Sequence, residues 1–176
     1  MRKPLFLCLV FISISMFSQT LLEKVAISSQ MYGSLDPNQL KLTILDAINL
    51  TNEKDVIAAY LTKIEKDFVW IVVTFRYEYV VSVTEPKIIS KKPLETAVFT
   101  YSVGLRDAIS LTVMSIGKNI LFALYQPEGW LVGNDKNLAV VSMKTPAILR
   151  IDQSPTLFRQ VQQEILRKQQ GGGGAK

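Results

Sequence analysis

The stretch that decides the fold is residues 68–84, which read FVWIVVTFRYEYVVSVT. Every second side chain from Val69 to Val83 is apolar, and successive side chains of a strand point to opposite faces of a sheet. The intervening side chains begin apolar at Phe68 and become polar towards Ser82. We therefore expect one unusually long strand over residues 68–84, buried on both faces at its start and on one face further along.

Shorter runs on the C-terminal side of this stretch predict further strands. Residues 96–103 alternate between apolar and polar, and residues 119–126 are apolar on both faces, as in a central strand. Residues 130–132 follow a Pro-Glu-Gly turn and are expected to pair back, and residues 138–143 and 147–151 predict two more strands. The pattern thus indicates a mostly antiparallel sheet of about five strands.

Helices are expected on both sides of this sheet in the sequence. Asp36-Pro37 is a typical helix start, and Leu40, Ile44 and Ile48 follow it at a helical spacing. A second helix is expected over residues 53–66, where five apolar side chains share one face: Val56, Ile57, Tyr60, Leu61 and Ile64.

The C-terminal half adds a helix and an open question. Ser154-Pro155 predicts the start of a final helix that runs to about residue 169. Between Gly104 and Gly117, the spacing of apolar residues favours a helix over 105–116, whereas the Thr and Val content favours a strand. Both possibilities stay open at this point.

The expected fold class is α+β, with the sheet packed by N-terminal helices and a C-terminal helix. From residue 53 to 169 the order of elements resembles that of roadblock and profilin-type domains. A curved sheet that cradles helices, of the cystatin or nuclear-transport-factor kind, is the alternative, and the state of residues 105–116 decides between them. No internal repeat is evident, and neither resemblance implies a function, because common folds host unrelated activities.

The N-terminus has the layout of a secretory signal peptide. Arg2 and Lys3 precede an apolar run from Leu5 to Phe17, which a short stretch of small and polar residues follows. We expect a signal peptide over 1–18, a lead-in segment over 19–35, one α+β domain over 36–169 and a flexible Gly-rich tail over 170–176. The protein would then be exported, periplasmic or secreted; the alternative is a membrane anchor formed by residues 5–22.

Composition excludes several kinds of chemistry. The chain contains no histidine, and its one cysteine, Cys8, lies in the leader. Cleavage would therefore remove the thiol and leave no imidazole, so His-based triads and His- or Cys-ligated metals are not expected. The net charge of +5 falls to +3 without Arg2 and Lys3, and the basic residues form no stripe of the kind that nucleic-acid binding needs.

Few residues suggest a binding or catalytic site. Trp130 follows a turn, where a large aromatic side chain serves as a partner-binding anchor if exposed, or caps the end of the sheet if it folds back. Tyr77 and Tyr79 are the other candidate partner-binding residues. Residues 134–137, NDKN, lack the carboxylates of a calcium loop and predict a turn. No catalytic residue, cofactor or metal is expected.

Three functional hypotheses follow. The first is a non-catalytic exported interaction module, an accessory subunit of an envelope or extracellular assembly that binds another protein or itself. The second is a carrier of a small apolar ligand, held against the apolar face of residues 69–83. The third is a hydrolase that uses two carboxylates, with four acids as candidates: Glu78, Glu85, Asp107 and Glu128.

Overall fold

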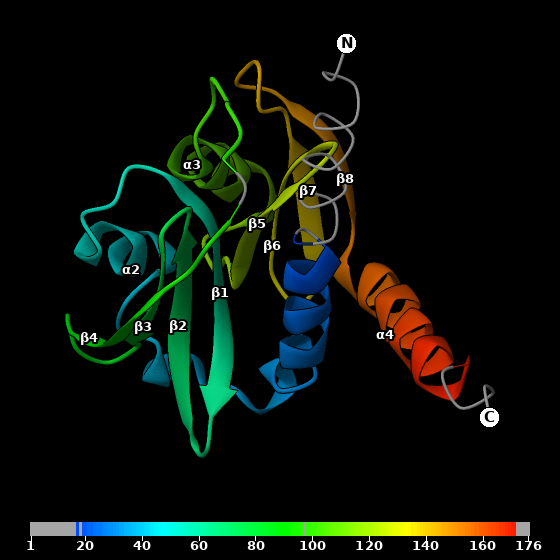
Figure 1. Ribbon diagram of the computed structural model, residues 1–176, viewed down its shortest axis with the longest axis horizontal. Coiled ribbons are helices and arrows are strands. Elements are labelled where there is room, and N and C mark those ends of the chain that lie inside the picture. Colours follow the sequence, from blue (N-terminus) through cyan, green and yellow to red (C-terminus); the bar gives the residue numbers. More distant parts are fainter. Residues whose placement is uncertain (1–16, 18, 97, 172–176) are drawn as a thin grey trace, which may run out of the picture.

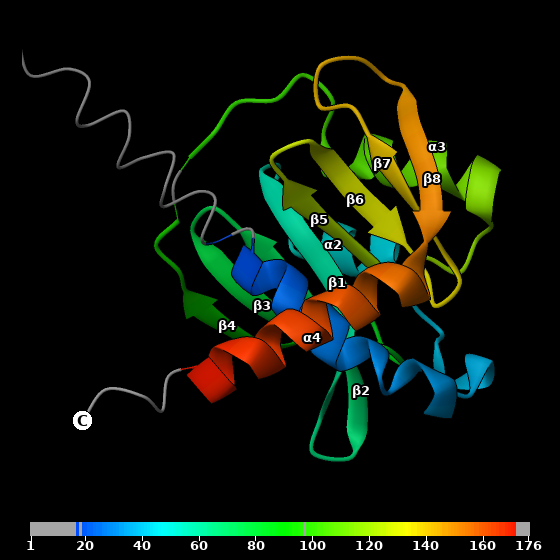
Figure 2. The same cartoon turned by 90° about the vertical axis from the view of Figure 1, so that its right-hand side faces the viewer.

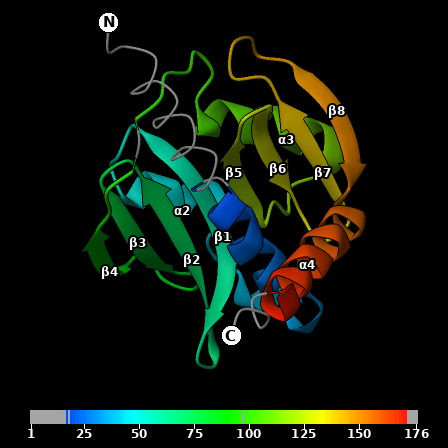
Figure 3. The same cartoon turned by 45° about the vertical axis from the view of Figure 1, so that its right-hand side comes forward.

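A computed structural model describes residues 17, 19–96 and 98–171 of the chain. Its centre is a single antiparallel sheet of eight strands in the order β4-β3-β2-β1-β5-β6-β7-β8 (Figure 1). Figure 3 shows β4 and β8 at the two ends of this sheet. The strands are β1 (Val56–Ile64), β2 (Asp67–Thr74), β3 (Tyr77–Ser82), β4 (Ile88–Pro93), β5 (Phe122–Gln126), β6 (Gly129–Gly133), β7 (Asn137–Val141) and β8 (Ile148–Gln153).

Helices cover both faces of the sheet. Figure 2 shows α4 (Ser154–Gly171) and the N-terminal helix (residues 19–29) on one face, with α2 (Ile44–Leu50) and α3 (Leu105–Ile116) behind the sheet. Two short 3₁₀ helices, Tyr32–Ser34 and Pro37–Gln39, connect the N-terminal helix to α2. The α+β class with a mostly antiparallel sheet is confirmed, but the expected number of about five strands is wrong.

The expected helix over residues 53–66 is wrong, because most of this segment forms strand β1. The first six residues of β1 are buried, and the strand pairs with β2 on one side and with β5 on the other. A strand buried on both faces reads as a continuous apolar run, whose spacing can imitate a helical face. The neighbours of β1 in the sheet, which are distant in sequence, decide its conformation.

The expected single strand over residues 68–84 is also wrong. Thr74 ends β2, and its Oγ1 accepts hydrogen bonds from the backbone N–H groups of Arg76 (3.2 Å) and Tyr77 (2.9 Å). The chain reverses there, so Val73 of β2 pairs with Glu78 of β3. The turn shifts the alternation, because the register places Val69, Ile71 and Val73 on the face opposite to Tyr77 and Tyr79. Helices on both faces of the sheet bury both rows.

The remaining expectations have mixed outcomes. The first helix begins at Ile44 rather than after Asp36-Pro37, since Thr43 and Asp46 form a capping box there. Residues 98–104 are in neither helix nor strand, contrary to the strand expected over 96–103. Residues 105–116 are helical, and the C-terminal strands and the final helix are confirmed.

The structure also reveals an internal repeat that the sequence inspection missed. One helix and four strands, α2 with β1–β4, recur as α3 with β5–β8, and the two units pair through β1 and β5. The register shift between Val80 and Val81 recurs, 60 residues later, between Val140 and Val141. Asp46 caps α2 as Asp107 caps α3, and Ser82 holds the β3–β4 turn as Ser142 holds the β7–β8 turn.

This repeat changes the order of elements on which the resemblances rested. From α2 onward the chain runs as helix, four strands, helix, four strands and helix. The matching sequence is short: LDAINL at 45–50 aligns with RDAISL at 106–111, and VVS at 80–82 aligns with VVS at 140–142. Residues that cap, turn or fill the core are therefore the ones that the two units share.

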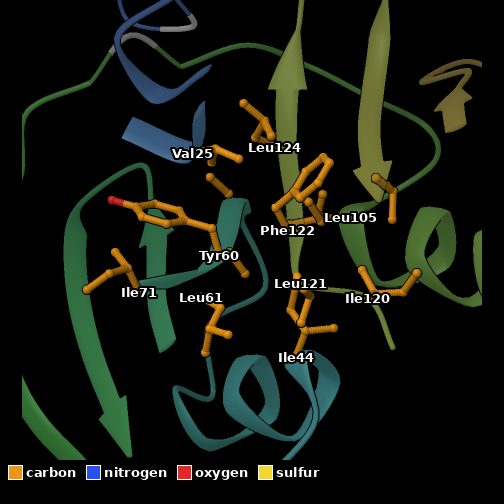
Figure 4. Packing of buried hydrophobic residues seen from close by; sticks show 14 of the residues in the cluster. Val25, Ile44, Tyr60, Leu61, Ile71, Leu105, Ile120, Leu121, Phe122 and Leu124 are labelled. Atoms are coloured by element: carbon orange, nitrogen blue, oxygen red, sulfur yellow. The ribbon is translucent and has the colours of Figure 1, made fainter. Parts of the chain in front are cut away.

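The hydrophobic core has two layers, one on each face of the sheet. Figure 4 shows Tyr60 of β1 and Leu124 of β5 on the side of Val25, which belongs to the N-terminal helix. Leu61 and Leu121 lie on the other side, towards Ile44 of α2. All six of these side chains are at most 5% exposed, so both layers are shielded from solvent. The segment expected as a lead-in, residues 19–35, thus supplies part of the core.

The two ends of the chain concern the predicted signal peptide and the predicted Gly-rich tail. The expected signal peptide over 1–18 lies, apart from Phe17, outside the described residues. The Gly-rich tail begins later than expected, since α4 continues to Gly171, and the rest of the tail also lies outside the described residues. In the part of the chain that the structure describes, no helix has the length and hydropathy that crossing a membrane requires.

Candidate functional site

The free edge of β8 exposes two apolar side chains, as does β4, where Ile88 and Ile89 are 38% and 55% exposed. Leu149 and Ile151 are 57% and 50% exposed. Ser154 N–H donates to Lys136 O (3.0 Å), so the backbone groups of Ser154 point towards β7. Alternate residues of an antiparallel strand point the other way, so the N–H and C=O groups of Ile151 and Gln153 face away from β7. These residues therefore present unpaired hydrogen-bonding groups beside exposed apolar side chains. We call Ile148–Gln153 the β8 edge.

The opposite edge of the sheet, β4, carries basic residues and a proline. Lys91 and Lys92 precede Pro93, which has no N–H to offer to an added strand. In the second unit the positions 60 residues later hold Ile151, Asp152 and Gln153. Charges and proline discourage edge-to-edge pairing, so β4 is protected where β8 is not.

Tyr77 and Tyr79, two predicted partner-binding residues, belong to a polar cluster next to β4. The Lys91 Nζ lies 3.7 Å from the ring centre of Tyr77 and 5.0 Å from that of Tyr79. The Tyr79 hydroxyl donates to Glu53 Oε1 at 2.5 Å, and Lys91 Nζ lies 4.0 Å from the same oxygen. The cluster gives both tyrosines an intramolecular contact, and their role in partner binding stays a prediction.

Burial and charge shift the titration of this cluster. Burial raises the pKa of Tyr79, and the hydrogen bond to Glu53 raises this pKa further because it holds the phenolic proton. The hydrogen bond between Lys91 and Tyr79 raises the pKa of Lys91. Near neutral pH Tyr79 is therefore a neutral phenol and Lys91 an ammonium group, an arrangement that packs this edge of the sheet.

Trp130, the third predicted partner-binding residue, is fully buried. Its Nε1–H donates to Val103 O at 2.7 Å, and its ring lies 5.3 Å from the ring of Tyr101 between ring centres. The side chain therefore cannot be the exposed anchor that we considered. It packs against the sheet, as the alternative interpretation had it, because the segment before α3 folds over it.

An ion-pair network lies on the other face of the β8 strand. The Arg150 guanidinium contacts both carboxylate oxygens of Glu128 (2.7 and 2.8 Å) and, through Nε, Asp152 Oδ2 (2.7 Å). These hydrogen bonds raise the pKa of Arg150, the pair with Glu128 contributing most. The network borders a pocket of about 390 Å³ that Leu22 of the N-terminal helix and Leu157 of α4 also line. One guanidinium faces two carboxylates, so the network keeps a net charge of −1.

A larger pocket, of about 540 Å³, opens beside Trp70. Three segments far apart in sequence meet there: residues 32–43 before α2, residues 116–121 after α3 and the turn at 134–137. The turn predicted at 134–137 is confirmed, since Asn134 Oδ1 accepts from the backbone N–H groups of Lys136 and Asn137, both at 2.9 Å. Sequence reasoning missed this pocket, because nothing in the spacing of these segments brings them together.

The four acids considered for hydrolysis lie on different elements. Glu78 of β3 pairs with Lys24 (3.6 Å), Glu128 pairs with Arg150, and Asp107 caps α3. Glu85 lies in the β3–β4 turn. Within the described residues, no group of three His, Cys, Asp or Glu side chains could hold a metal ion. Structural partners thus account for three of these carboxylates.

The wholly apolar face expected to hold a small ligand is instead part of the core. Val69, Ile71 and Val73 are each at most 5% exposed and pack on the side of the N-terminal helix. The larger pocket lies on the opposite face, where Trp70 contributes to its wall. A ligand-carrying function would therefore use other residues than those first considered.

Comparison with known proteins gives little guidance. No family model and no curated protein matches the sequence. One solved structure that matches is described as a "putative lipoprotein" from Clostridium difficile 630. It is 15% identical to this chain, covers 65% of this chain and 95% of its own, and gives a TM-score of 0.36. A likeness at this level carries no inference about what this chain does.

Proposed function

We propose that this protein is a non-catalytic interaction module that binds an extended segment of a partner protein at the β8 edge. The single observation behind this proposal is the contrast between the two ends of the sheet. Both edges expose apolar side chains, but on β4 the exposed Ile88 and Ile89 are followed by Lys91, Lys92 and Pro93. On β8 the matching positions hold Ile151, Asp152 and Gln153, beside unpaired backbone groups. Strand addition uses such an edge, with backbone hydrogen bonds for affinity and alternate side chains for specificity.

The chemistry of the edge defines the partner segment. Leu149 and Ile151 flank Arg150, whose charge Glu128 and Asp152 compensate. The partner strand is therefore expected to place apolar side chains opposite Leu149 and Ile151. A β8 edge from a second copy of the chain meets this description, and self-association is one form that the interaction takes.

Export is the second part of the proposal. The expected leader over residues 1–18 supports a periplasmic or secreted module, and a retained anchor over residues 5–22 is the alternative. N-terminal sequencing of the expressed protein, together with cell fractionation, tests this part. An unprocessed N-terminus in a cytoplasmic fraction would contradict it.

The edge itself is tested by a matched pair of variants. Leu149→Lys/Ile151→Lys places two charges on the β8 edge, and Ile88→Lys/Ile89→Lys places two on β4. If the wild type forms a dimer or a crosslinked complex, we expect the β8 variant to lose it and the β4 variant to retain it. Light scattering after size exclusion and crosslinking in the producing cell are the measurements.

Two results would contradict this proposal. One is a wild-type chain that is monomeric at all concentrations and crosslinks to no protein. The other is a complex that survives in the β8 variant, provided that circular dichroism shows the variant to be folded. Loss of the complex in both variants would likewise argue against a role specific to β8.

A further inference from the structure

The pocket beside Trp70 has a counterpart in the second unit that aromatic side chains fill. Trp70 Nε1–H donates to Leu42 O at 3.0 Å, just as Trp130 Nε1–H donates to Val103 O. The neighbouring turns also match, because Thr74 Oγ1 and Asn134 Oδ1 each accept two backbone N–H groups from the residues two and three positions ahead. The surroundings of the two tryptophans can therefore be compared position by position.

Around Trp130, rings occupy the space next to the tryptophan. Phe99 lies 5.1 Å from Phe75, 3.9 Å from Tyr125 and 6.4 Å from Trp130 between ring centres, and Tyr101 also packs on Trp130. These rings join the segment before α3 to the β2–β3 turn. The second unit thus shows which chemistry completes this site when the chain itself supplies it.

Around Trp70 the corresponding positions hold no rings. The hydrogen bonds of the two tryptophans align Leu42 with Val103, so Leu40 takes the place of Tyr101 and Asn38 that of Phe99. The matched turns align Thr74 with Asn134, so Asp135 takes the place of Phe75. The result is the pocket of about 540 Å³, with Leu40 and Ile120 in its apolar wall. This volume lies within the range of about 300–1,000 Å³ that small-molecule sites occupy.

The polar rim of the pocket determines the charge of what fits there. In the second unit the Tyr101 hydroxyl reaches Asp55 Oδ1 at 3.4 Å, in the loop that follows α2. The loop that follows α3 instead brings Lys118 and Asn119 to the pocket, and the turn brings Lys136 and Asp135. Two ammonium groups against one carboxylate favour a ligand with a single negative charge.

We propose that the pocket beside Trp70 binds a small aromatic carboxylate, whose ring takes the place that Phe99 and Tyr101 fill beside Trp130 and whose carboxylate faces Lys118 and Lys136. The ring packs against Leu40, Ile120 and the wall that Trp70 forms. The site lies between the segment before α2, the end of α3 and the turn at 134–137, and the β8 edge contributes no residue to it. This inference therefore stands independently of the proposed partner binding.

The test uses two ligands of the same shape and different charge, 3-phenylpropanoate and 3-phenylpropan-1-ol. Isothermal titration of the full chain is expected to show binding of the acid and weaker binding of the alcohol. Lys118→Gln/Lys136→Gln should weaken binding of the acid about five- to tenfold and leave the alcohol unchanged, since exposed ion pairs contribute modestly. Lys87→Gln/Lys144→Gln, a control of equal charge change, should alter neither.

A second kind of variant fills the pocket. Leu40→Tyr copies Tyr101 of the second unit, and it should abolish binding of both ligands without lowering the melting temperature. Leu35→Trp, at another lining position, serves the same purpose if Leu40→Tyr does not fold. Leu149→Lys/Ile151→Lys should bind the acid as the wild type does, which separates this site from the partner-binding edge.

Three outcomes would overturn the inference. The first is a wild type that binds neither ligand at millimolar concentration. The second is a filled variant that binds as well as the wild type, and the third is a lysine variant that loses affinity for the acid and for the alcohol equally. Each of these results would assign the pocket no role in recognising an aromatic carboxylate.

Discussion

Two tryptophans hold equivalent positions in the two units of the molecule. Each indole N–H reaches the backbone carbonyl of the residue that leads into a helix, Leu42 for Trp70 and Val103 for Trp130. Both side chains are at most 1% exposed. Each tryptophan therefore fixes the position of a helix over the sheet by a buried hydrogen bond as well as by packing.

Replacing Trp130 by phenylalanine is expected to destabilise the protein. The change leaves Val103 O without its donor and opens a cavity, which together cost about 2–4 kcal/mol. Urea unfolding, followed by circular dichroism, measures the loss. Val98→Ala is the control, since Val98 is 70% exposed and its truncation should change the free energy of unfolding by less than about 0.5 kcal/mol. An equal effect of both changes would contradict this account of Trp130.

Buried tyrosines predict a loss of stability at alkaline pH. Burial raises the pKa of Tyr32 and of Tyr60 well above the ordinary value of about 10, because the phenolate would lose its hydration. Below pH 10 both states of the protein keep these protons. Above it the unfolded chain releases them first, so the free energy of unfolding falls as the pH rises.

The size of this effect can be measured on Tyr60→Phe. We expect the wild type to lose stability between about pH 10 and 12, and the variant to lose less over the same range. Urea unfolding at a series of pH values supplies the comparison. Parallel curves for the two proteins would show that the titration of Tyr60 does not contribute.

At the scale of elements, the two matched helices differ in how they are capped. Asp46 Oδ2 accepts from Thr43 N at 2.8 Å, while Thr43 Oγ1 accepts from Asp46 N at 3.2 Å. Asp107 Oδ2 accepts from Gly104 N at 3.4 Å, and glycine has no side chain to return the bond. The first cap thus satisfies two backbone N–H groups by side chains and the second satisfies one.

This difference predicts unequal costs for the same substitution. Asp46→Ala should lower the free energy of unfolding by about 1–2 kcal/mol, and Asp107→Ala by about 0.5–1 kcal/mol. Thermal or urea unfolding of the two variants and of the double variant gives the comparison. Since the two caps share no hydrogen-bond partner, the costs should add. A larger cost for Asp107→Ala would contradict the capping argument.

At the scale of the whole molecule, the N-terminal helix and α4 close one face of the sheet together. Gln162 Nε2 donates to Ala26 O at 2.9 Å, and Lys168 Nζ lies 2.8 Å from Glu23 Oε1. Leu21, Val25 and Ala26 are at most 2% exposed, and Phe158 of α4 lies 5.3 Å from Phe122 of β5 between ring centres. Residues that we expected to be a lead-in are therefore required to cover the core.

Removal of the N-terminal helix should make unfolding less cooperative. A chain that begins at residue 19 keeps the N-terminal helix and should unfold in one transition. A chain that begins at residue 31 exposes the core layer that this helix covers and should not unfold in one cooperative transition. Val25→Asp, which buries a carboxylate among apolar side chains, should lower the free energy of unfolding by about 3 kcal/mol or more. Calorimetry distinguishes these cases. A shortened chain as stable as the longer one would show that the helix is dispensable.

The sequence predicted the elements whose signals are local. Gly104, Gly117 and the helical spacing between them favoured α3, and Ser154-Pro155 marked the start of α4. The same local reading failed at β1, where an apolar run fits both a helix and a buried strand, and at residues 68–84, where alternation continues through a turn. It left the position of Trp130 open between an exposed anchor and a buried side chain, because a lone aromatic residue carries no signal of the segment that covers it.

By itself, then, the sequence determined the α+β class, the absence of histidine and the positions of the four C-terminal strands and of the last helix. Those properties depend on composition and on residues within a few positions of one another. Only the tertiary structure decided the conformation of β1, the eight-stranded order, the repeat and the pocket beside Trp70. Each of these depends on contacts between segments far apart in the chain, and a strand that is apolar on both sides becomes a strand only when neighbours on both sides pair with it.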